Sequence, residues 1–247
     1  MITEAGDAPT VEGLANLRDL GGLPTEAGQL THQRRLLRSD SPHDLTATGL
    51  RAFLDLGVST VVDLRTVSER EKLPSPLVSA ADVRHHHAPI FNDGDDFPNH
   101  LTTAAEVYGW WLRERGSGVA TALRAIADAD SAPILVHCHA GKDRTGVIIA
   151  LVLRLAGVTV DAIADDYALS GVQLADMLAR DRVSAVAAGM DEARVQRLFT
   201  VHRDEMVHTL AGIDEGSGGV AALLRRIGVD EPRIDRLARL MLAPQWP

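Results

Sequence analysis

The chain has 247 residues, of which 45% are hydrophobic and 24% charged, a composition typical of a globular protein with one large domain. Its formal net charge of −9 argues against nucleic-acid binding, which needs a basic surface to neutralise phosphates. No stretch reaches the ~20 apolar residues that cross a bilayer, and residues 1–30 carry no secretory signal. We therefore expect no transmembrane segment and a cytoplasmic location, although a cysteine-poor chain can also be exported.

Residues 1–12 predict a loose N-terminus, and residues 13–247 predict a single domain. The first half of that domain holds short apolar or β-branched segments that predict strands, at 35–39, 60–64 and 83–90. An apolar face over Asp44–Leu56, followed by Gly57, predicts a helix between the first two strands.

Residues 104–127 predict one long helix or two, with a break at Gly116-Ser-Gly118. A short apolar strand at 133–136 is followed by a glycine-containing loop and an apolar helix over 147–155. Beyond residue 161 the pattern is helical, including 192–210 and 220–227. Strands that alternate with helices, then helices alone, predict an α/β fold with a helical C-terminal portion.

The segment that carries chemistry is His137-Cys-His-Ala-Gly-Lys-Asp-Arg-Thr-Gly146, directly after the strand at 133–136. Five residues separate Cys138 from Arg144, enough for the backbone N–H groups to curl inward and bind a phosphate dianion at a helix N-terminus. The planar guanidinium of Arg144 would hold two phosphate oxygens. The same positive field favours the thiolate form of Cys138.

Such a thiolate predicts a two-step reaction, in which a phosphocysteine forms and water then hydrolyses it. The Thr145 hydroxyl is placed to donate a hydrogen bond to the sulfur, and His137 is expected to orient the loop. Inward amides and Arg144 supply the charge stabilisation, so we expect neither a metal nor a cofactor.

The proton donor for the leaving group is left open between two carboxyl groups. Asp143 lies in the loop itself, and Asp63 ends a strand expected to lie beside the one ending at Val136. Three acids of the loop over 91–99 rank lower, namely Asp93, Asp95 and Asp96.

The loop His137–Gly146 resembles the signature loop of protein tyrosine phosphatases and their dual-specificity relatives. Its form, HCxAGKDRTG, is similar to that of the atypical bacterial tyrosine phosphatases, which include phosphoinositide phosphatases. The resemblance extends from about residue 13 to residue 242. It rests also on Asn16–Gly22, Leu37-Arg-Ser39, Val62-Asp-Leu-Arg65 with Glu69, Asp166-Tyr167 with Ser170, and Gly218-Gly219 with Leu223 and Gly228.

This resemblance implies a central, mostly parallel sheet flanked by helices, with Cys138 as nucleophile and Arg144 as the phosphate-binding arginine. Lys142 resembles the loop lysine of inositol-lipid phosphatases, and Asp63 matches an acidic position near the family's active site. A Trp-Pro-Asp loop is missing from the sequence. The implied phosphate-binding residues are His139, Ala140, Gly141, Lys142, Asp143, Arg144, Thr145 and Gly146. The implied substrate is a phosphotyrosine protein, with phosphoserine, phosphothreonine or phosphoinositides as further candidates.

Other patterns predict supporting roles. Arg18 and Asp19 are interpreted as a structural ion pair beneath the loop. The triplet His85-His-His87 suggests a metal site only weakly, because consecutive strand residues point to alternate faces. Residues 161–230 are expected to supply a helical lid or substrate region. The sequence leaves the oligomeric state open.

Two other functions compete with a phosphatase. A rhodanese-like sulfurtransferase also uses a cysteine loop, although such loops usually lack the Arg-Thr-Gly ending found at 144–146. A non-catalytic phosphate-binding module would be expected to have lost the cysteine or the arginine, and both are present.

Overall fold

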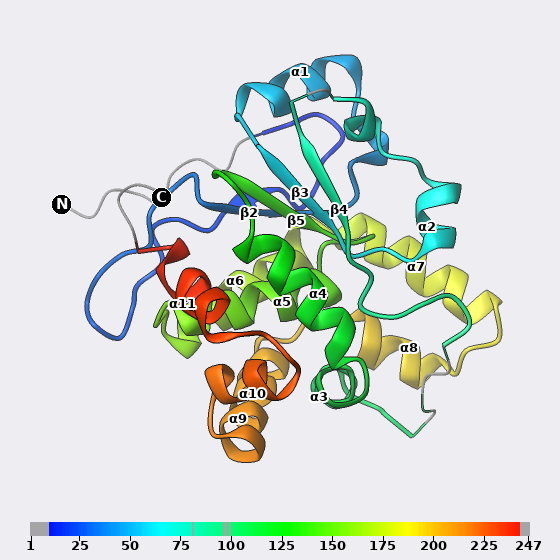
Figure 1. The fold of residues 1–247 in the computed structure, drawn as a ribbon. Helices are drawn as coiled ribbons and strands as arrows, with labels where there is room; N and C mark the ends of the chain where they lie inside the picture. The colour runs from blue at the N-terminus through cyan, green and yellow to red at the C-terminus, as the bar shows by residue number, and fades with distance from the viewer. Residues whose placement is uncertain (1–9, 81, 96–97, 99, 243–247) are drawn as a thin grey trace.

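The computed structural model describes residues 10–80, 82–95, 98 and 100–242. Most of the expected loose N-terminus, and Asp96 of the acidic loop, lie outside these residues. The described part of the chain is an α/β fold with a central sheet flanked by helices, as the sequence predicts (Figure 1).

The sheet has the strand order β1-β2-β5-β3-β4. Only the pairing of β1 with β2 is antiparallel, and the other pairings are parallel. The strands are β1 (Arg18–Asp19), β2 (Leu36–Ser39), β3 (Thr60–Asp63), β4 (Arg84–His87) and β5 (Ile134–His137). Because β5 is central, its carboxyl end lies between those of β2 and β3, where ligands bind in open α/β sheets.

Alternation along the strands separates two cores. On β5, Ile134 and Val136 face one layer of buried apolar side chains, and Leu135 faces the other. The smaller layer contains Phe53 of helix α1 (Ala47–Asp55). The larger layer contains Val147–Leu153 of helix α5 (Asp143–Leu155), and this burial explains the unbroken apolar run.

Helices cover both faces of the sheet, with α1 on one side and α3–α6 and α9–α11 on the other (Figure 1). The helices not yet bounded are α2 (Val67–Lys72), α3 (Ala104–Glu114), α4 (Gly116–Ala127), α6 (Val160–Gln173), α7 (Ala175–Ala187), α8 (Glu192–Phe199), α9 (Arg203–Ser217), α10 (Val220–Arg226) and α11 (Glu231–Leu240). Short 3-10 turns occupy Pro42–Asp44 and Pro76–Ser79.

The predicted elements are confirmed in kind, with differences in extent that include a shorter strand at Arg84–His87 and a helix that begins at Ala47. The break expected at Gly116-Ser-Gly118 is real, because α3 ends at Glu114 and α4 begins at Gly116. The single helix predicted over 192–210 is wrong, since the chain leaves the helical conformation between α8 and α9. Helix α5 starts four residues earlier than predicted because it includes the polar end of the loop.

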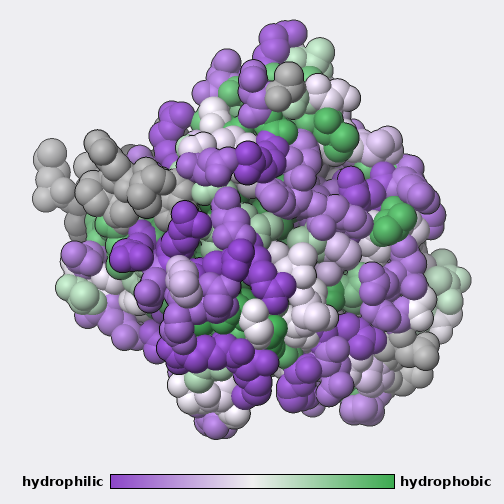
Figure 2. Space-filling view, in the orientation of Figure 1, coloured by the Kyte–Doolittle hydropathy of each residue, from purple (hydrophilic) through white to green (hydrophobic). Residues whose placement is uncertain are grey.

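Helix α7 is the least covered helix of the C-terminal portion. Leu178 is its one buried residue, while Val183 and Val186 are exposed. The face drawn in Figure 2 is mostly hydrophilic, with hydrophobic side chains scattered over it. Among the described residues, no helix combines the length and the apolar character needed to span a membrane.

Candidate active site

Cys138 lies at the point where the central strand becomes a helix. Strand β5 ends at His137, the loop takes four residues after Cys138, and α5 begins at Asp143. The Cys138 side chain is 3% exposed and lies at the edge of a cavity. Strand, loop and helix N-terminus in immediate succession are the arrangement that binds an anion with backbone N–H groups.

The loop carbonyl groups are held by donors outside the loop. Hydrogen bonds reach the carbonyl oxygens of His139 from Ser41 N (2.8 Å), of Ala140 from Asn16 Nδ2 (3.0 Å) and of Gly141 from Arg38 Nη2 (2.7 Å). With its carbonyls turned outward, the loop is left with inward amides to bind a phosphate.

Gly141 has a left-handed backbone, with φ of +67°. A Cβ atom at this position would lie 2.1 Å from the carbonyl oxygen of Ser39, at the end of β2. Both the dihedral and the close approach of the backbone require glycine here.

A buried ion-pair network supports the loop from below. The Asp166 carboxylate on α6 binds Arg18 Nε and Arg38 Nη1, each at 2.6 Å. Burial alone would raise the pKa of Asp166, but the two guanidinium groups hold it below its usual value. The predicted Arg18–Asp19 pair is therefore wrong. Consecutive strand residues point to opposite faces, and Asp19 instead accepts hydrogen bonds from the backbone of Gly21 and Arg34.

Arg144 is fixed by a carboxylate and an aromatic ring. Its Nη1 and Nη2 atoms bind Glu69 at 2.6 and 2.7 Å, and its guanidinium carbon lies 5.1 Å from the centre of the Phe91 ring. Burial works against the charge, but the hydrogen bonds that Arg144 donates to Glu69 and the electrostatic attraction of the nearby Cys138 raise the pKa of Arg144 above its usual value. The arginine is thus a permanent, oriented cation beside the sulfur.

Two loop side chains lie between Cys138 and the surrounding helices. Lys142 is 2% exposed, and its Nζ donates to the carbonyl oxygen of Leu198 at the end of α8 (3.0 Å). The same Nζ lies 3.4 Å from Asp143 Oδ1. That oxygen also accepts a hydrogen bond from the Tyr108 hydroxyl group of α3.

Asp63 lies beside the loop but not in the cavity wall. Its strand pairs with β5 as the sequence predicts, with Asp63 opposite His137. Its carboxylate accepts from Arg65 Nη2 at 2.8 Å and faces Arg70 Nε at 3.4 Å. Burial would raise the pKa of Asp63, but His137 and Arg65 together hold it below its usual value. A carboxyl group in this setting stays ionised.

The described acids of the 91–99 loop are engaged away from the cavity. Asp93 accepts hydrogen bonds from the backbone and hydroxyl of Ser68, at the start of α2. Asp95 forms an ion pair with Arg115 at 3.1 Å.

His137 and Thr145 are both fully enclosed. His137 Nδ1 lies 3.1 Å from the carbonyl oxygen of Cys138, and burial lowers the pKa of His137 to about 4, so the ring is neutral. The Thr145 hydroxyl has no hydrogen-bond partner within the described structure, so the predicted bond to the sulfur is not formed in this state.

The cavity above the loop has a volume of about 450 Å³. Its floor is formed by Cys138, Arg144 and their loop neighbours. Its walls are mostly apolar and aromatic, with contributions from Leu101, Val107, Tyr108, Trp111, Leu178, Met190, Leu198 and Phe199. The residues over 161–230 thus reach the cavity through α7, α8 and the turn between them.

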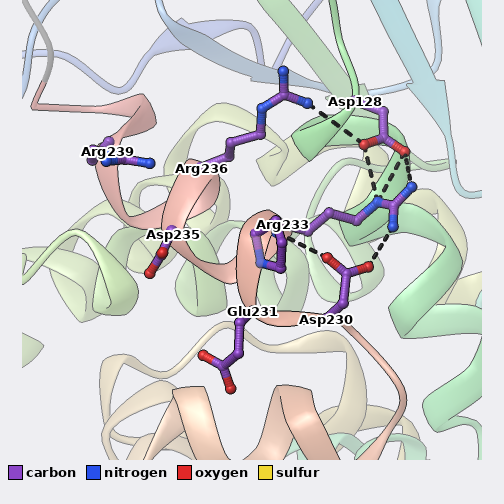
Figure 3. A pocket seen from close by; sticks show the side chains of 8 residues that line it. Asp128, Asp230, Glu231, Arg233, Asp235, Arg236 and Arg239 are labelled. Atoms are coloured by element: carbon purple, nitrogen blue, oxygen red, sulfur yellow. Dashed lines mark hydrogen bonds and ion pairs between the residues drawn. The ribbon is translucent and has the colours of Figure 1, made fainter.

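A second hollow lies between the end of α4 and α11 (Figure 3). Four of its charged side chains are joined by ion pairs, with Asp128 and Asp230 both bound to Arg233 and Asp128 also close to Arg236. The described residues that line it include no cysteine or serine to act as nucleophile. The cavity above Cys138 is therefore the better candidate for the active site.

The histidine triplet faces backbone carbonyl groups. His85 Nε2 lies 2.8 Å from the carbonyl oxygen of Leu77, and His87 Nε2 lies 2.8 Å from that of Arg65. Within the part of the chain that the structure describes, no three His, Cys, Asp or Glu side chains converge on a metal site.

Comparison with known proteins decides the family. A model of the tyrosine phosphatase family matches residues 9–243. The chain belongs to this family. It is accordingly a phosphatase, and the sulfurtransferase alternative is not favoured.

Relatives match over most of the chain. A tyrosine-protein phosphatase of Nostoc commune is 31% identical over 78% of this chain and 69% of its own length. The triple specificity protein phosphatase PtpB of Mycobacterium tuberculosis is 25% identical over 93% of this chain and 97% of its own. A protein of Cupriavidus necator is 29% identical over 91% of this chain and 88% of its own.

Two site residues were not found from the sequence. Glu69 was noted in the resemblance without a role, although the spacing Thr66-x-x-Glu69 is a capping-box signal that places its carboxylate. Tyr108 gave no signal, because a tyrosine within an apolar helix pattern reads as a core residue.

Proposed function

We propose that the chain hydrolyses phosphate monoesters through a phosphocysteine on Cys138, with phosphotyrosine as the preferred substrate. The observation that carries this proposal is the loop itself. Its carbonyl groups are tied outward, and Arg144 is held beside the sulfur by Glu69. This arrangement stabilises the equatorial charge of a phosphoryl group in transfer.

The cavity walls support an aromatic phosphoester. Trp111, Tyr108 and Phe199 line the cavity, and an aromatic leaving group gains from such neighbours by stacking and edge contacts. Lys142 and Arg194 add positive charge on the same cavity, which suits a second anionic group. Phosphoserine, phosphothreonine and phosphoinositides are therefore secondary candidates, in keeping with the triple specificity named for the mycobacterial relative.

In the first step the Cys138 thiolate attacks phosphorus. The S–P bond forms as the P–O bond to the leaving group breaks, and the electron pair goes to the leaving oxygen, which takes a proton. In the second step a water oxygen attacks phosphorus and loses a proton to the carboxylate that acted as acid in the first step. The S–P bond breaks, its electron pair returns to Cys138 as the thiolate, and inorganic phosphate leaves. The buried Thr145 hydroxyl, unpartnered in this state, is available to the sulfur as the S–P bond breaks.

We assign the proton donor to Asp143. Its side chain is 37% exposed and lines the cavity, whereas Asp63 lies outside the lining residues and is held as a carboxylate by Arg65. Asp63 then serves to orient Arg65 and the end of β3. His137, neutral and buried, holds the loop backbone and takes no part in proton transfer.

The nucleophile is tested with p-nitrophenyl phosphate. We expect Cys138→Ser to lose at least ~10³-fold in kcat, since a serine hydroxyl here has no general base, while vanadate still binds the variant loop. Wild-type activity should be unchanged by EDTA. Retention of activity in Cys138→Ser, or turnover of thiosulfate and cyanide by the wild type, would contradict the phosphocysteine mechanism.

The acid is tested by comparing Asp143→Asn with Asp63→Asn on aryl phosphates of different leaving-group acidity. For Asp143→Asn we expect a loss of ~10²-fold in kcat/KM on phenyl phosphate and a much smaller loss on p-nitrophenyl phosphate, which needs less help to leave. Asp63→Asn should lower both rates equally, through disorder of Arg65. The reverse pattern would assign the proton to Asp63.

A further inference from the structure

Three groups form a hydrogen-bonded chain that leads from the core to the cavity. Tyr167 on α6 and Tyr108 on α3 are each 1% exposed, and their hydroxyl oxygens lie 2.8 Å apart. The Tyr108 hydroxyl in turn donates to Asp143 Oδ1 at the N-terminus of α5. Helices from three separate parts of the sequence therefore converge on one carboxyl group.

The order of donors along this chain is fixed by counting protons. A hydroxyl group has one proton, and Tyr108 uses its proton in the hydrogen bond that it donates to Asp143. The bond between the two tyrosines must then be donated by Tyr167. Burial and the nearby Asp143 raise the pKa of both tyrosines, so both remain protonated at any pH at which the enzyme works. The tyrosines act as donors and do not shuttle protons.

The two oxygens of Asp143 are not equivalent. Oδ1 receives the Tyr108 hydroxyl and lies 3.4 Å from Lys142 Nζ. Among the residues that the structure describes, none forms a hydrogen bond with Oδ2. A carboxyl group whose Oδ1 accepts the Tyr108 hydroxyl carries its own proton on Oδ2.

We propose that Tyr108, supported by Tyr167, is a positioning residue that reserves Asp143 Oδ1 as an acceptor and so places the transferable proton on Oδ2. This inference rests on the proposed role of Asp143 as the acid. Because Tyr108 also lines the cavity, the same residue sets the angle of the carboxyl group relative to a bound ester.

The test uses Tyr108→Phe and Tyr167→Phe, which delete one hydroxyl group each and keep the ring in the core. We expect Tyr108→Phe to lose ~10-fold or more in kcat/KM on phenyl phosphate and less than about 3-fold on p-nitrophenyl phosphate. Tyr167→Phe should show the same preference with a smaller loss. The Kd for vanadate should stay within about 2-fold of wild type, which shows an intact loop.

A pH profile separates positioning from general damage. A hydrogen bond donated to a carboxylate favours its charged form, so its removal should move the falling, high-pH limb of kcat/KM to higher pH in Tyr108→Phe. Equal losses on both substrates without a shift of that limb would overturn the inference.

The outcomes for Asp143→Asn separate this inference from the proposed function. If Asp143→Asn shows no dependence on the leaving group, the assignment of the acid fails. If Asp143→Asn shows that dependence and both tyrosine variants behave as wild type, only the role of Tyr108 fails. Should Tyr108→Phe not fold, Tyr167→Phe carries the same test.

Discussion

At the scale of single residues, identical side chains acquire different roles from their neighbours. Asp143 lies in the loop and Asp63 beside it, yet Asp63 is buried against Arg65 while Asp143 faces the cavity with one oxygen bound by Tyr108. Their sequence contexts could not separate them, because the position of each carboxyl group relative to the cavity, and the Tyr108 partner of Asp143, come from the tertiary structure. For Gly141 the sequence context is enough, since a glycine inside an anion-binding loop already indicates a backbone conformation that other residues rarely adopt.

Gly141→Ala should abolish most of the activity. Its Cβ would meet the Ser39 backbone, and its left-handed φ adds strain of about 1–2 kcal/mol. Gly157→Ala is the matched control, because φ is +77° there but a Cβ would meet nothing within 4 Å. We expect the free energy of unfolding, measured in urea, to be lower in both variants. Vanadate binding should be lost in Gly141→Ala alone. Normal vanadate binding by Gly141→Ala would contradict the steric argument.

At the scale of elements, helix α2 is a six-residue helix that serves the site through its N-terminal cap. The Thr66 hydroxyl accepts from the Glu69 backbone, and Glu69 Oε2 accepts from the Thr66 backbone at 2.8 Å. The same Glu69 carboxylate holds Arg144. The Glu69 side chain thus both caps α2 and orients Arg144.

Thr66→Ala and Thr103→Ala remove the same capping hydroxyl from two helices. Each starts a capping box, that of α2 or of α3, and each should cost about 1 kcal/mol in stability. Only Thr66→Ala should also raise KM for p-nitrophenyl phosphate, by about 2–5-fold, because Glu69 then holds Arg144 less firmly. The variants are compared by urea unfolding and steady-state kinetics. An equal effect of both on KM would show that α2 does not position Arg144.

At the scale of the whole molecule, a chain of net charge −9 must attract an anionic substrate. Arg144 and Lys142 bring positive charge to the lining of one cavity, and a local field of this kind can oppose the charge of the whole molecule. The buried charges beneath that site make stability depend on pH.

Stability should fall as the pH drops below about 6.5. Burial lowers the pKa of His137 to about 4, so between these values the unfolded chain binds a proton that the folded chain does not. The free energy of unfolding should then decrease by up to about 1.4 kcal/mol per pH unit. Asp63, 3.8 Å from His137 Nε2, opposes this shift by favouring the charged ring. Below about pH 4, protonation of Asp166, whose pKa is lowered by its two arginines, removes further stability.

Urea unfolding of wild type and His137→Asn at pH 7, 6 and 5 checks this prediction. The change in the free energy of unfolding between pH 7 and pH 5 should be smaller in His137→Asn than in the wild type. The control His32→Asn, at an exposed site, should keep the wild-type pH dependence. A wild-type slope in His137→Asn would show that other groups control acid stability.

The sequence by itself determined the chemistry that is contiguous in the chain. The run His137–Gly146 specifies nucleophile, arginine and glycine because an anion-binding loop is one strand end, one turn and one helix start. Hydrophobic periodicity also predicted the order of strands and helices along the chain, including the strand over 133–136. The periods of strands and helices can be read from neighbouring residues alone. Where the chain offered no local constraint, as between α8 and α9, the predicted boundary was wrong.

Only the tertiary structure decided which distant residues complete the site. Asp166 rather than Asp19 pairs with Arg18, Glu69 binds Arg144, and Tyr108 reaches Asp143, across separations of up to 148 residues. These contacts depend on helix packing over the sheet, and packing is set by the whole core. The order of residues in the loop is thus local, whereas the contacts that support the loop and the Tyr108 partner of Asp143 are properties of the fold.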